Sequence, residues 1–223
     1  MVPELQLVIG NRNYSSWSLR AWLAAKASGL AFEEILIPLD RPETKGLLAQ
    51  HSPSGLVPVL KVGTHTVWDS LAIIETLNDL APEAGIWPKD TMTRAWARAV
   101  AAEMHAGFFR LRRDMPMDLR THNPGTQHTE GALGDAAKII AIWSACREAH
   151  AADGPFLFGP WSAADMMYAP VVGRFRTYGV ELPATVQAYS DAVWAHPDMA
   201  AWVAGARAEP YVIEYDLGGG GSA

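Results

Sequence analysis

Apolar residues in the first eighty positions of the chain follow two different repeat lengths. The run LQLVIG at residues 5–10 is short, continuously apolar and closed by a glycine, which is typical of a strand. Leu19, Trp22 and Leu23 recur at helical spacing ahead of Gly29, which predicts a helix that ends at the glycine. On the same criteria, strands are expected at residues 5–10, 32–39, 57–62 and 65–68, and helices at residues 16–29, 42–51 and 70–81. This order predicts a parallel strand pair with an antiparallel hairpin at the edge of the sheet.

The pattern changes after a turn-rich stretch at residues 82–90, because the later segments repeat only with helical spacing. One stripe predicts a long helix through Trp96, Val100, Met104, Phe108 and Leu111. A second stripe, within residues 133–149, consists of Leu133, Ala137, Ile140, Ser144 and Arg147. Three more helices are expected at residues 162–179, 183–196 and 197–207. We therefore expect an α/β domain at residues 1–82 and an all-helical domain at residues 91–216.

Composition and charge narrow the classes of function. The 223 residues carry a formal net charge of −6, and the balance of 49% hydrophobic and 19% charged residues is typical of a globular protein. Lysines and arginines do not cluster with aromatic residues, so no nucleic-acid partner is expected. The first residues include no basic leader, and their apolar run is too short to span a bilayer. We expect a cytoplasmic protein with no membrane partner.

Reactive groups are few in this sequence. Cys146 is the single cysteine, so neither an internal disulfide nor a CxxC pair is expected. It lies within a predicted helix, where we expect a packed and unreactive side chain. Any thiol chemistry therefore needs a thiol brought by a ligand. The histidines form no HExxH or Cys/His quartet, so no metal site is predicted, and no P-loop, GxSxG or dinucleotide motif occurs.

Four short stretches, taken together, resemble the glutathione S-transferase superfamily. They are NYSSWSLR, PSGLVPVL, WDSLAII and GPWSAADMMYAP, and their order and spacing extend the resemblance over nearly the whole chain. The serine pair and the SLAII helix are most similar to the zeta and other serine-type bacterial members. The resemblance implies a thioredoxin-like first domain that binds glutathione as a co-substrate, an all-helical second domain and a homodimer.

The resemblance places the glutathione site on two turns of the first domain. It implies a cis bond between Val57 and Pro58, which turns the backbone of Val57 toward the cysteinyl part of the peptide. From the residues alone, a trans proline at the start of a strand is the alternative. Asp69 is expected to pair with the glutamyl ammonium group, and Ser70, at a helix N-terminus, to bind the γ-glutamyl carboxylate. A plain helix N-cap is the alternative role for Ser70.

Ser15 and Ser16 stand directly before the first predicted helix, and either of them can cap it. A helix N-terminus also stabilises a thiolate, and the resemblance implies that one serine donates a hydrogen bond to the sulfur of glutathione. A free thiol has a pKa of about 8.5, so such a bond favours the reactive anion at neutral pH. Ser15, by its distance from Gly29, is the predicted catalytic residue. Ser16 is the alternative or simply the cap, and Tyr14 is a further candidate.

Two adjacent positions depart from the family. Lys, Gln or His usually precedes the Val-Pro step and contacts the glycyl end of glutathione, whereas Gly55 and Leu56 stand here. The glycyl carboxylate therefore needs another partner, and His51 or Lys45 could supply it. The sequence does not decide between these two residues.

Ser162 and Asp165 have the spacing of a capping box, in which a serine and an acid satisfy the first N–H groups of a helix. In the family this box stabilises a core helix. We therefore predict a structural role for both residues and no part in the chemistry.

The acceptor substrate is expected to lie against Trp17, which adjoins the proposed thiol, and against the long helix of the second domain. The predicted acceptor-site residues are Trp17, Met104, Phe108 and Arg112, with His105 and Arg113 on the same helix. The apolar stripe of that helix is also compatible with a purely core role. Arg174 and Arg176 lie near the position of a substrate-binding arginine in zeta-like isomerases, but one to three residues out of register with it.

The resemblance thus predicts a glutathione transferase, in which the activated thiol attacks a small electrophilic substrate between the domains. A glutathione-dependent isomerase of the maleylacetoacetate type is one alternative. A catalytically silent relative that serves as a binding module is another, and the departure at Gly55 and Leu56 favours it.

Overall fold

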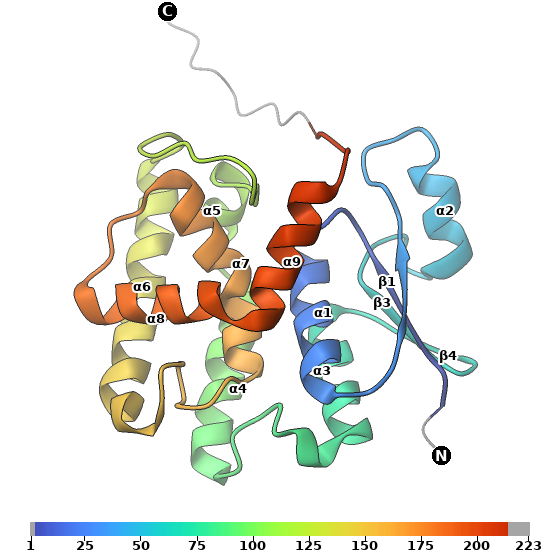
Figure 1. The fold of residues 1–223 in the computed structure, drawn as a ribbon. Coiled ribbons are helices and arrows are strands. Elements are labelled where there is room, and N and C mark those ends of the chain that lie inside the picture. Colours follow the sequence, from blue (N-terminus) through green and yellow to red (C-terminus); the bar gives the residue numbers. More distant parts are fainter. Residues whose placement is uncertain (1–2, 214–223) are drawn as a thin grey trace, which may run out of the picture.

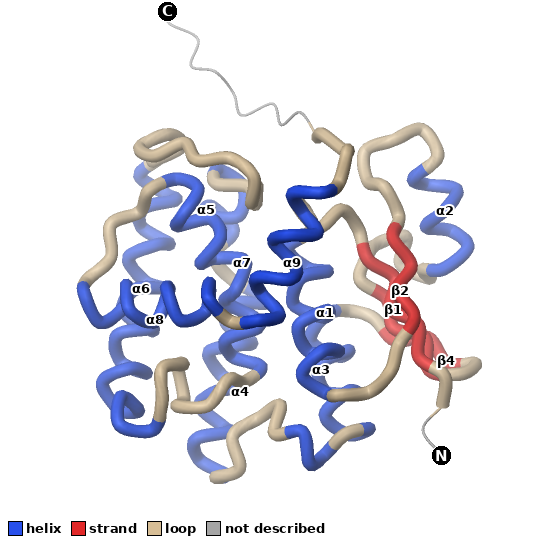
Figure 2. Tube along the Cα trace, in the orientation of Figure 1, coloured by secondary structure: helices blue, strands red, loops and turns tan. Residues whose placement is uncertain are grey.

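A four-stranded mixed sheet forms the N-terminal part of the computed structural model, which describes residues 3–213 (Figures 1 and 2). The strands are β1 (Leu5–Ile9), β2 (Glu33–Leu36), β3 (Val59–Val62) and β4 (His65–Val67). Their order across the sheet is β2-β1-β3-β4. Strand β1 pairs with β2 in parallel and with β3 in antiparallel, and β3 and β4 form the antiparallel hairpin. The parallel pair and the hairpin edge are confirmed.

Helices cover both faces of this sheet. Those of the N-terminal part are α1 (Ser16–Ser28), α2 (Thr44–His51) and α3 (Ser70–Leu80). Helices α1 and α3 pack against each other on the face toward the rest of the molecule, and α2 lies on the outer side (Figure 1). Successive side chains of a strand point to opposite faces. Leu7 and Ile9 of β1 accordingly enter the main core, whereas Val8 joins a smaller core with Leu47 and Leu48 of α2.

The remaining described residues are helical, apart from connecting turns. The helices are α4 (Thr91–Ala106), α5 (Phe109–Asp114), α6 (Glu130–His150), α7 (Ala163–Tyr178), α8 (Ala184–Ala195) and α9 (Pro197–Ala208). Helix α7 is the central one and packs against α1, α4 and α8. Helix α1 also contacts α9 (Figure 1). Because α1 is enclosed by the sheet, α3 and α7, all of its residues except Trp17, Lys26 and Ala27 are buried.

The long helix predicted through residues 96–111 is wrong, because the chain breaks it into α4 and α5. Helix α4 ends before Gly107, and Phe108 adopts a left-handed conformation with φ of 54°. A Cβ atom at Gly107 would lie 2.8 Å from the carbonyl oxygen of Glu103, so the absence of a side chain permits this turn. The break changes the direction of the chain, and the apolar stripe continues on a separate short helix.

The predicted stripe of α6 is shifted by one residue from the face that is buried. Leu133 is 40% exposed, whereas the buried side includes Ala132, Ala136, Ile139 and Trp143. Trp143 packs edge-on against aromatic rings of α7 and α8, which are Tyr168 and Tyr189. The burial of this large side chain sets the rotation of the helix.

The predicted capping box at the start of α7 is confirmed. Ser162 is the N-cap, and Asp165 Oδ2 accepts hydrogen bonds from the Ser162 amide at 2.9 Å and from its hydroxyl at 3.0 Å. Asp165 Oδ1 accepts from the amide of Leu157 at 2.9 Å. Residues 214–216, at the end of the predicted second domain, lie outside the described residues.

Candidate active site between the sheet and the helices

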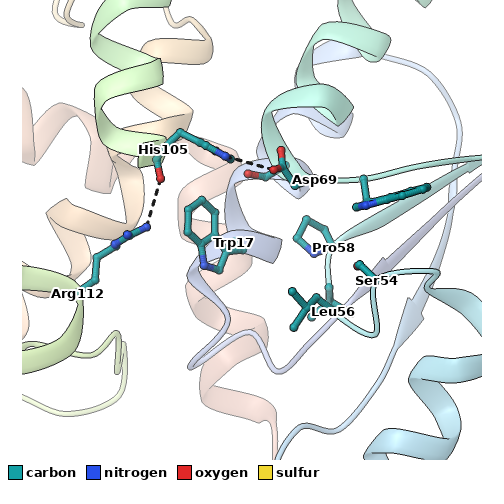
Figure 3. Close-up of a pocket in the computed structure, with 10 residues that line it drawn as sticks. Trp17, Ser54, Leu56, Pro58, Asp69, His105 and Arg112 are labelled. Atoms are coloured by element: carbon teal, nitrogen blue, oxygen red, sulfur yellow. Dashed lines mark hydrogen bonds and ion pairs between the residues drawn. The ribbon is translucent and has the colours of Figure 1, made fainter. Parts of the chain in front are cut away.

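A cavity of about 510 Å³ opens where the edge of the N-terminal part faces α4 and α5 (Figure 3). Its lining residues are Trp17, Ser54, Leu56, Val57, Pro58, Trp68, Asp69, Ser70, His105 and Arg112. Figure 3 shows Pro58, Leu56 and Asp69 on one side, His105 and Arg112 on the other, and Trp17 between them. The structure therefore brings together Trp17, Arg112 and four of the residues predicted to bind glutathione, which are Val57, Pro58, Asp69 and Ser70.

The turn before β3 carries the predicted cis bond. The Val57–Pro58 peptide is cis, so the alternative of a trans proline is wrong. Pro58 is buried and Val57 is partly exposed, and both line the cavity. The Trp68–Asp69 peptide, at the other lining turn, is cis as well.

The N-terminus of α3 brings Asp69 and Ser70 to the sheet side of the cavity. Asp69 is the N-cap, and its Oδ1 accepts from the amide of Leu71 at 3.1 Å. Ser70 is the first helical residue, so the alternative of a plain N-cap serine is wrong. The Ser70 hydroxyl is buried and has no hydrogen-bond partner among the described residues. Such a group costs free energy unless something binds to it.

His105, on α4, connects the two walls of the cavity. Its Nε2 lies 3.2 Å from Asp69 Oδ2, and its ring meets Trp17 edge-on with centroids 5.2 Å apart (Figure 3). Its Nδ1 is buried and has no partner within the described part of the chain. The backbone oxygen of His105 accepts from Arg112 Nη1 at 3.4 Å.

Two of the predicted acceptor residues lie elsewhere. Met104 is fully buried and Phe108 nearly so, and both belong to the core instead of the cavity wall. His105, the residue after Met104, and Arg112, four residues after Phe108, line the cavity. The apolar period predicts a role for Met104 and assigns His105 only to the same helix. The polar character of His105 indicates its position, because a residue directly after a core position on a helix faces another direction.

The serine pair stands at the start of α1, as predicted. Ser15 is the N-cap, and its Oγ accepts from the Ser18 amide at 3.4 Å. Its hydroxyl also donates to Ser18 Oγ at 2.7 Å, an atom that accepts from the Gly10 amide at 3.0 Å. Both serines are buried, and Ser15 lines neither this cavity nor the adjoining one.

The adjoining cavity, of about 470 Å³, shares Trp17 and Arg112 with the first. Its lining residues are Tyr14, Ser16, Trp17, Phe109, Arg112, Arg113, Pro116, Met117 and Arg174. Arg174 Nη2 donates to Ser16 Oγ at 3.4 Å, and its Nε donates to the backbone oxygen of Met115 at 2.8 Å. The hydroxyl of Tyr14 accepts from Arg120 Nη2 at 2.7 Å.

Several other candidates are not at either cavity. His51 and Lys45 line neither, and His51 Nδ1 lies 3.0 Å from Lys61 Nζ. Partial burial and the charge of Lys61 lower the pKa of His51. Arg176 is directed away and pairs with Asp191 at 2.9 Å.

The side chain of Cys146 is buried in the main core, as predicted. Burial raises the pKa of its thiol to about 12, which keeps it protonated at neutral pH. The described residues contain no group of three or more metal-ligating side chains. None of the described helices has the length and apolarity to cross a bilayer.

A thioredoxin-like sheet unit joined to an all-helical region, with a cavity at their boundary, defines the class of this protein. Family models confirm the class: "Glutathione S-transferase, N-terminal domain" matches residues 14–80, and "Glutathione S-transferase, C-terminal domain" matches residues 126–205. The chain belongs to the glutathione S-transferase superfamily.

Individual relatives agree with this assignment. A probable maleylacetoacetate isomerase from Caenorhabditis elegans is 34% identical over 96 residues, which are 43% of this chain. The aligned part spans only 44% of that relative's length. Glutathione S-transferase L1 from Arabidopsis thaliana is 23% identical over 82% of this chain and 70% of its own.

A solved structure of a glutathione transferase homolog from Burkholderia, with bound glutathione, has a TM-score of 0.69 and 27% identity. The similarity covers 92% of this chain and 100% of that one. A maleylacetoacetate isomerase from Anaeromyxobacter dehalogenans has a TM-score of 0.64 and 28% identity, over 89% of this chain and 90% of its own.

Proposed function

We propose that this protein is a glutathione transferase, which binds glutathione in the first cavity and directs its thiolate at a small electrophilic substrate. Membership of the superfamily and the bound glutathione of the Burkholderia homolog support the co-substrate. The proposal assigns Val57, Pro58, Asp69 and Ser70 to the tripeptide. It assigns Trp17 and Arg112 to the acceptor.

The Ser70 hydroxyl, which has no hydrogen-bond partner within residues 3–213, is the observation that carries the proposal. Ser70 lines the cavity at the positive end of α3, where a carboxylate is stabilised by the helix dipole and by free N–H groups. A γ-glutamyl carboxylate bound here would accept the hydrogen bond that the buried hydroxyl lacks. The adjacent Asp69 is 57% exposed and can pair with the glutamyl ammonium group.

His105 acts in this proposal as a positioning residue for Asp69. The carboxylate uses one oxygen for the amide of Leu71 and the other for His105, so both oxygens have a fixed direction. The family resemblance implies Glu or Gln more often than Asp at this place, and Asp is one methylene shorter than either. The contact with His105 of α4 compensates for this by holding the short side chain of Asp69 at the cavity.

We assign thiol activation to Ser15, at the N-terminus of α1. Its side chain is buried and lines neither cavity, so its hydroxyl has to turn toward a sulfur bound beside Trp17. Its hydroxyl must exchange the hydrogen bond to Ser18 for one to the sulfur, which costs about 1 kcal/mol, the value of a neutral hydrogen bond. Ser18 Oγ still accepts from Gly10 after this exchange. The thiol proton passes to water, and the thiolate is stabilised by the hydroxyl and the helix dipole.

The chemical step then needs no further group from the protein. The sulfur lone pair forms a bond to the electrophilic carbon, and the leaving group departs with the electrons of its own bond. With an activated double bond as acceptor, the resulting carbanion instead takes a proton from water. Isomerisation by reversible addition of the same thiolate is the second candidate, which the two isomerase relatives favour.

Calorimetric titration of the protein with glutathione and with cysteinylglycine tests the assignment of the glutamyl site. Glutathione should bind, and the dipeptide should bind at least about tenfold more weakly because it lacks the carboxylate and ammonium groups. Conjugation of a chlorinated nitroaromatic then tests for turnover. Equal affinities would refute the site, and binding without turnover of any electrophile or of maleylacetoacetate would support the silent binding module.

The pKa of the bound thiol distinguishes the two serines. Ultraviolet absorbance of the thiolate against pH should show a higher pKa for Ser15→Ala than for the wild type, because the donor to the sulfur is lost. Ser16→Ala should leave that pKa nearly unchanged. The reverse pattern would assign activation to Ser16.

The proposal includes a homodimer, as the family resemblance implies, and a cytoplasmic location. Light scattering after size-exclusion chromatography should give twice the monomer mass of 24.2 kDa. A monomer at micromolar concentration would contradict this part alone.

A further inference from the structure

The sheet-side wall of the first cavity extends from the start of α3 to the loop before β3. Asp69 lies at one end of this wall and Pro58 in the middle, and Leu56 and Ser54 lie at the other end (Figure 3). In the proposed function, the γ-glutamyl group lies at the first end and the cysteinyl backbone lies beside Val57. One residue of the thiol peptide remains, and an extended residue spans at most about 3.6 Å. The C-terminal group of the peptide therefore lies at the loop end of the wall.

The described lining of this loop end has no positive charge. Leu56 is apolar and 68% exposed, and Ser54 offers a neutral hydroxyl. Among the described residues, the basic side chains that line the cavity are His105 and Arg112, and both come from the helical wall. A carboxylate at the loop end therefore meets no cation on its own wall.

Other basic residues of the N-terminal part are not directed at the cavity. Lys45, His51 and Lys61 line neither cavity, and His51 Nδ1 lies 3.0 Å from Lys61 Nζ. On the helical wall, the Cζ atom of Arg112 lies 5.2 Å from the centroid of the Trp17 ring. Trp17 lies between this guanidinium group and the loop end (Figure 3). The two residues that the sequence suggested as partners of the glycyl carboxylate, Lys45 and His51, are thus not at the site.

The backbone of the loop does not replace a cation. Ser52 Oγ accepts from the amide of Leu56 at 3.1 Å and donates to the carbonyl oxygen of Leu56 at 2.6 Å. That amide is therefore not available to a carboxylate. Gly55 has a φ of 69°, a conformation that favours glycine, so no side chain is presented there. The loop is anchored by Ser52 and presents a neutral surface to the cavity.

We propose that the first cavity does not recognise the C-terminal charge of its thiol peptide, and that it accepts γ-glutamylcysteinyl peptides with an uncharged C-terminal group as readily as glutathione. This inference rests on the proposed transferase function and names the class of its co-substrate. A carboxylate that leaves water without gaining a cation or a strong donor loses hydration without compensation. A neutral amide or ester loses less hydration. The alkyl group of an ester also gains an apolar contact with Leu56.

The test compares glutathione with its glycyl amide, which has nearly the same shape and lacks the C-terminal charge. Affinities are measured by calorimetry on the whole protein without an acceptor, so no turnover is involved. The two affinities should agree within about threefold, because a ratio of about fivefold or more is expected where a cation pairs with the acid. The glycyl ethyl ester should bind at least as tightly as glutathione.

Leu56→Lys supplies a positive charge at the loop end. The side chain is exposed and Ser52 holds the backbone at this residue, so the loop should keep its conformation. The affinity for glutathione should rise about fivefold, the upper value for an exposed ion pair, while the affinity for the amide stays unchanged. Higher salt should reduce the gain. Gln50→Lys, which adds the same charge at an exposed position outside both cavities, is the matched control and should change neither affinity.

The outcomes separate the inference from the function on which it rests. Glutathione bound more than about threefold more tightly than its amide would overturn the inference alone. If Arg112→Gln then removed that preference, the carboxylate would belong to the helical wall. No gain in Leu56→Lys would place the C-terminal group away from the loop end and would also overturn the inference. Failure of both peptides to bind would overturn the proposed function as well.

Discussion

The N-termini of α3 and α7 use the same two residue types and yet differ in every contact. At α7, Asp165 accepts three hydrogen bonds, and Ser162 takes part in the capping box. At α3, Asp69 caps the helix with one oxygen, and the buried hydroxyl of Ser70 has no partner within the described residues. At the start of α7 the capping groups are hydrogen-bonded to other described residues, whereas the start of α3 leaves the Ser70 hydroxyl for a ligand.

This difference shows how to separate a structural serine–aspartate pair from a binding one. Burial alone does not do so, because Ser70 and Ser162 are both buried. A structural pair is distinguished from a binding pair by whether it lines a cavity and by whether its hydrogen-bonding groups already have partners. Ser70 lines the first cavity and its donor is unused, whereas Asp165 lies in the core with its acceptors occupied. We expect substitutions at α7 to affect stability and substitutions at α3 to affect ligand affinity.

The largest effect is expected for Asp165→Ala. The change leaves three donors unpaired in the core, so the free energy of unfolding should fall by about 3 kcal/mol in a urea titration followed by tryptophan fluorescence. Asp191→Ala, which removes an exposed ion pair, is the control and should change stability by less than about 1 kcal/mol. Stability within 1 kcal/mol of the wild type for Asp165→Ala would show that the box is not the anchor of α7.

The pH dependence of stability is a second test of the structural role of Asp165 at the start of α7. Burial is the largest influence on the Asp165 carboxyl and raises its pKa to about 6 from 3.8, although its hydrogen bonds act in the opposite direction. The folded state therefore binds this proton more tightly than the unfolded state, so the contribution is full below a pH of about 4 and is lost as pH rises through about 6. The stability difference between wild type and Asp165→Asn should accordingly fall by on the order of 2 kcal/mol between pH values of about 4 and 7. A stability difference that does not change with pH would show that the pKa of Asp165 in the folded state is close to its value in the unfolded state.

Ser70→Ala should act on binding instead. The affinity for glutathione is expected to drop about tenfold, because one hydrogen bond to a charged group is lost. The free energy of unfolding should stay within about 0.5 kcal/mol of the wild type, since the hydroxyl has no hydrogen bond to lose to any described residue. Thr76→Ala, on the same helix, should change neither affinity nor stability appreciably. A loss of stability without a loss of affinity would reverse the comparison.

The smallest effect is expected for His105→Ala, which removes the contact that holds Asp69 at the cavity. The KM for glutathione should rise about threefold with little change in kcat, because Asp69 remains but is less well positioned. His122→Ala, an exposed histidine outside both cavities, is the control. A fall in kcat at unchanged KM would assign His105 a direct part in the chemistry.

Much of the fold followed from periodicity, and the exceptions have local causes. The strands and helices of residues 1–82 and the Ser162–Asp165 box could be predicted from short sequence patterns, because interactions between residues close in the sequence determine these features. The break at Gly107 and Phe108 was missed because the apolar stripe runs on across it. The rotation of α6 was missed because it depends on where the large ring of Trp143 packs.

The site could be predicted only where a motif marked it. The cis Val57–Pro58 bond and the pair Asp69 and Ser70 stood in recognisable stretches, and the structure brings them to one cavity. His105 and the buried Arg20 carry no motif, because their environment is created by helices far apart in the sequence. Only the packed structure shows that Arg20 donates from Nε to the backbone oxygen of Met167 while its Nη1 and Nη2 have no hydrogen-bond partner among the described residues.

A crystal structure of the protein with glutathione tests the central claim most directly. The γ-glutamyl carboxylate should lie within hydrogen-bond distance of Ser70 Oγ at the start of α3, with the ammonium group beside Asp69. A tripeptide bound with its glutamyl end elsewhere, while the Ser70 hydroxyl still lacks a partner, would contradict the account.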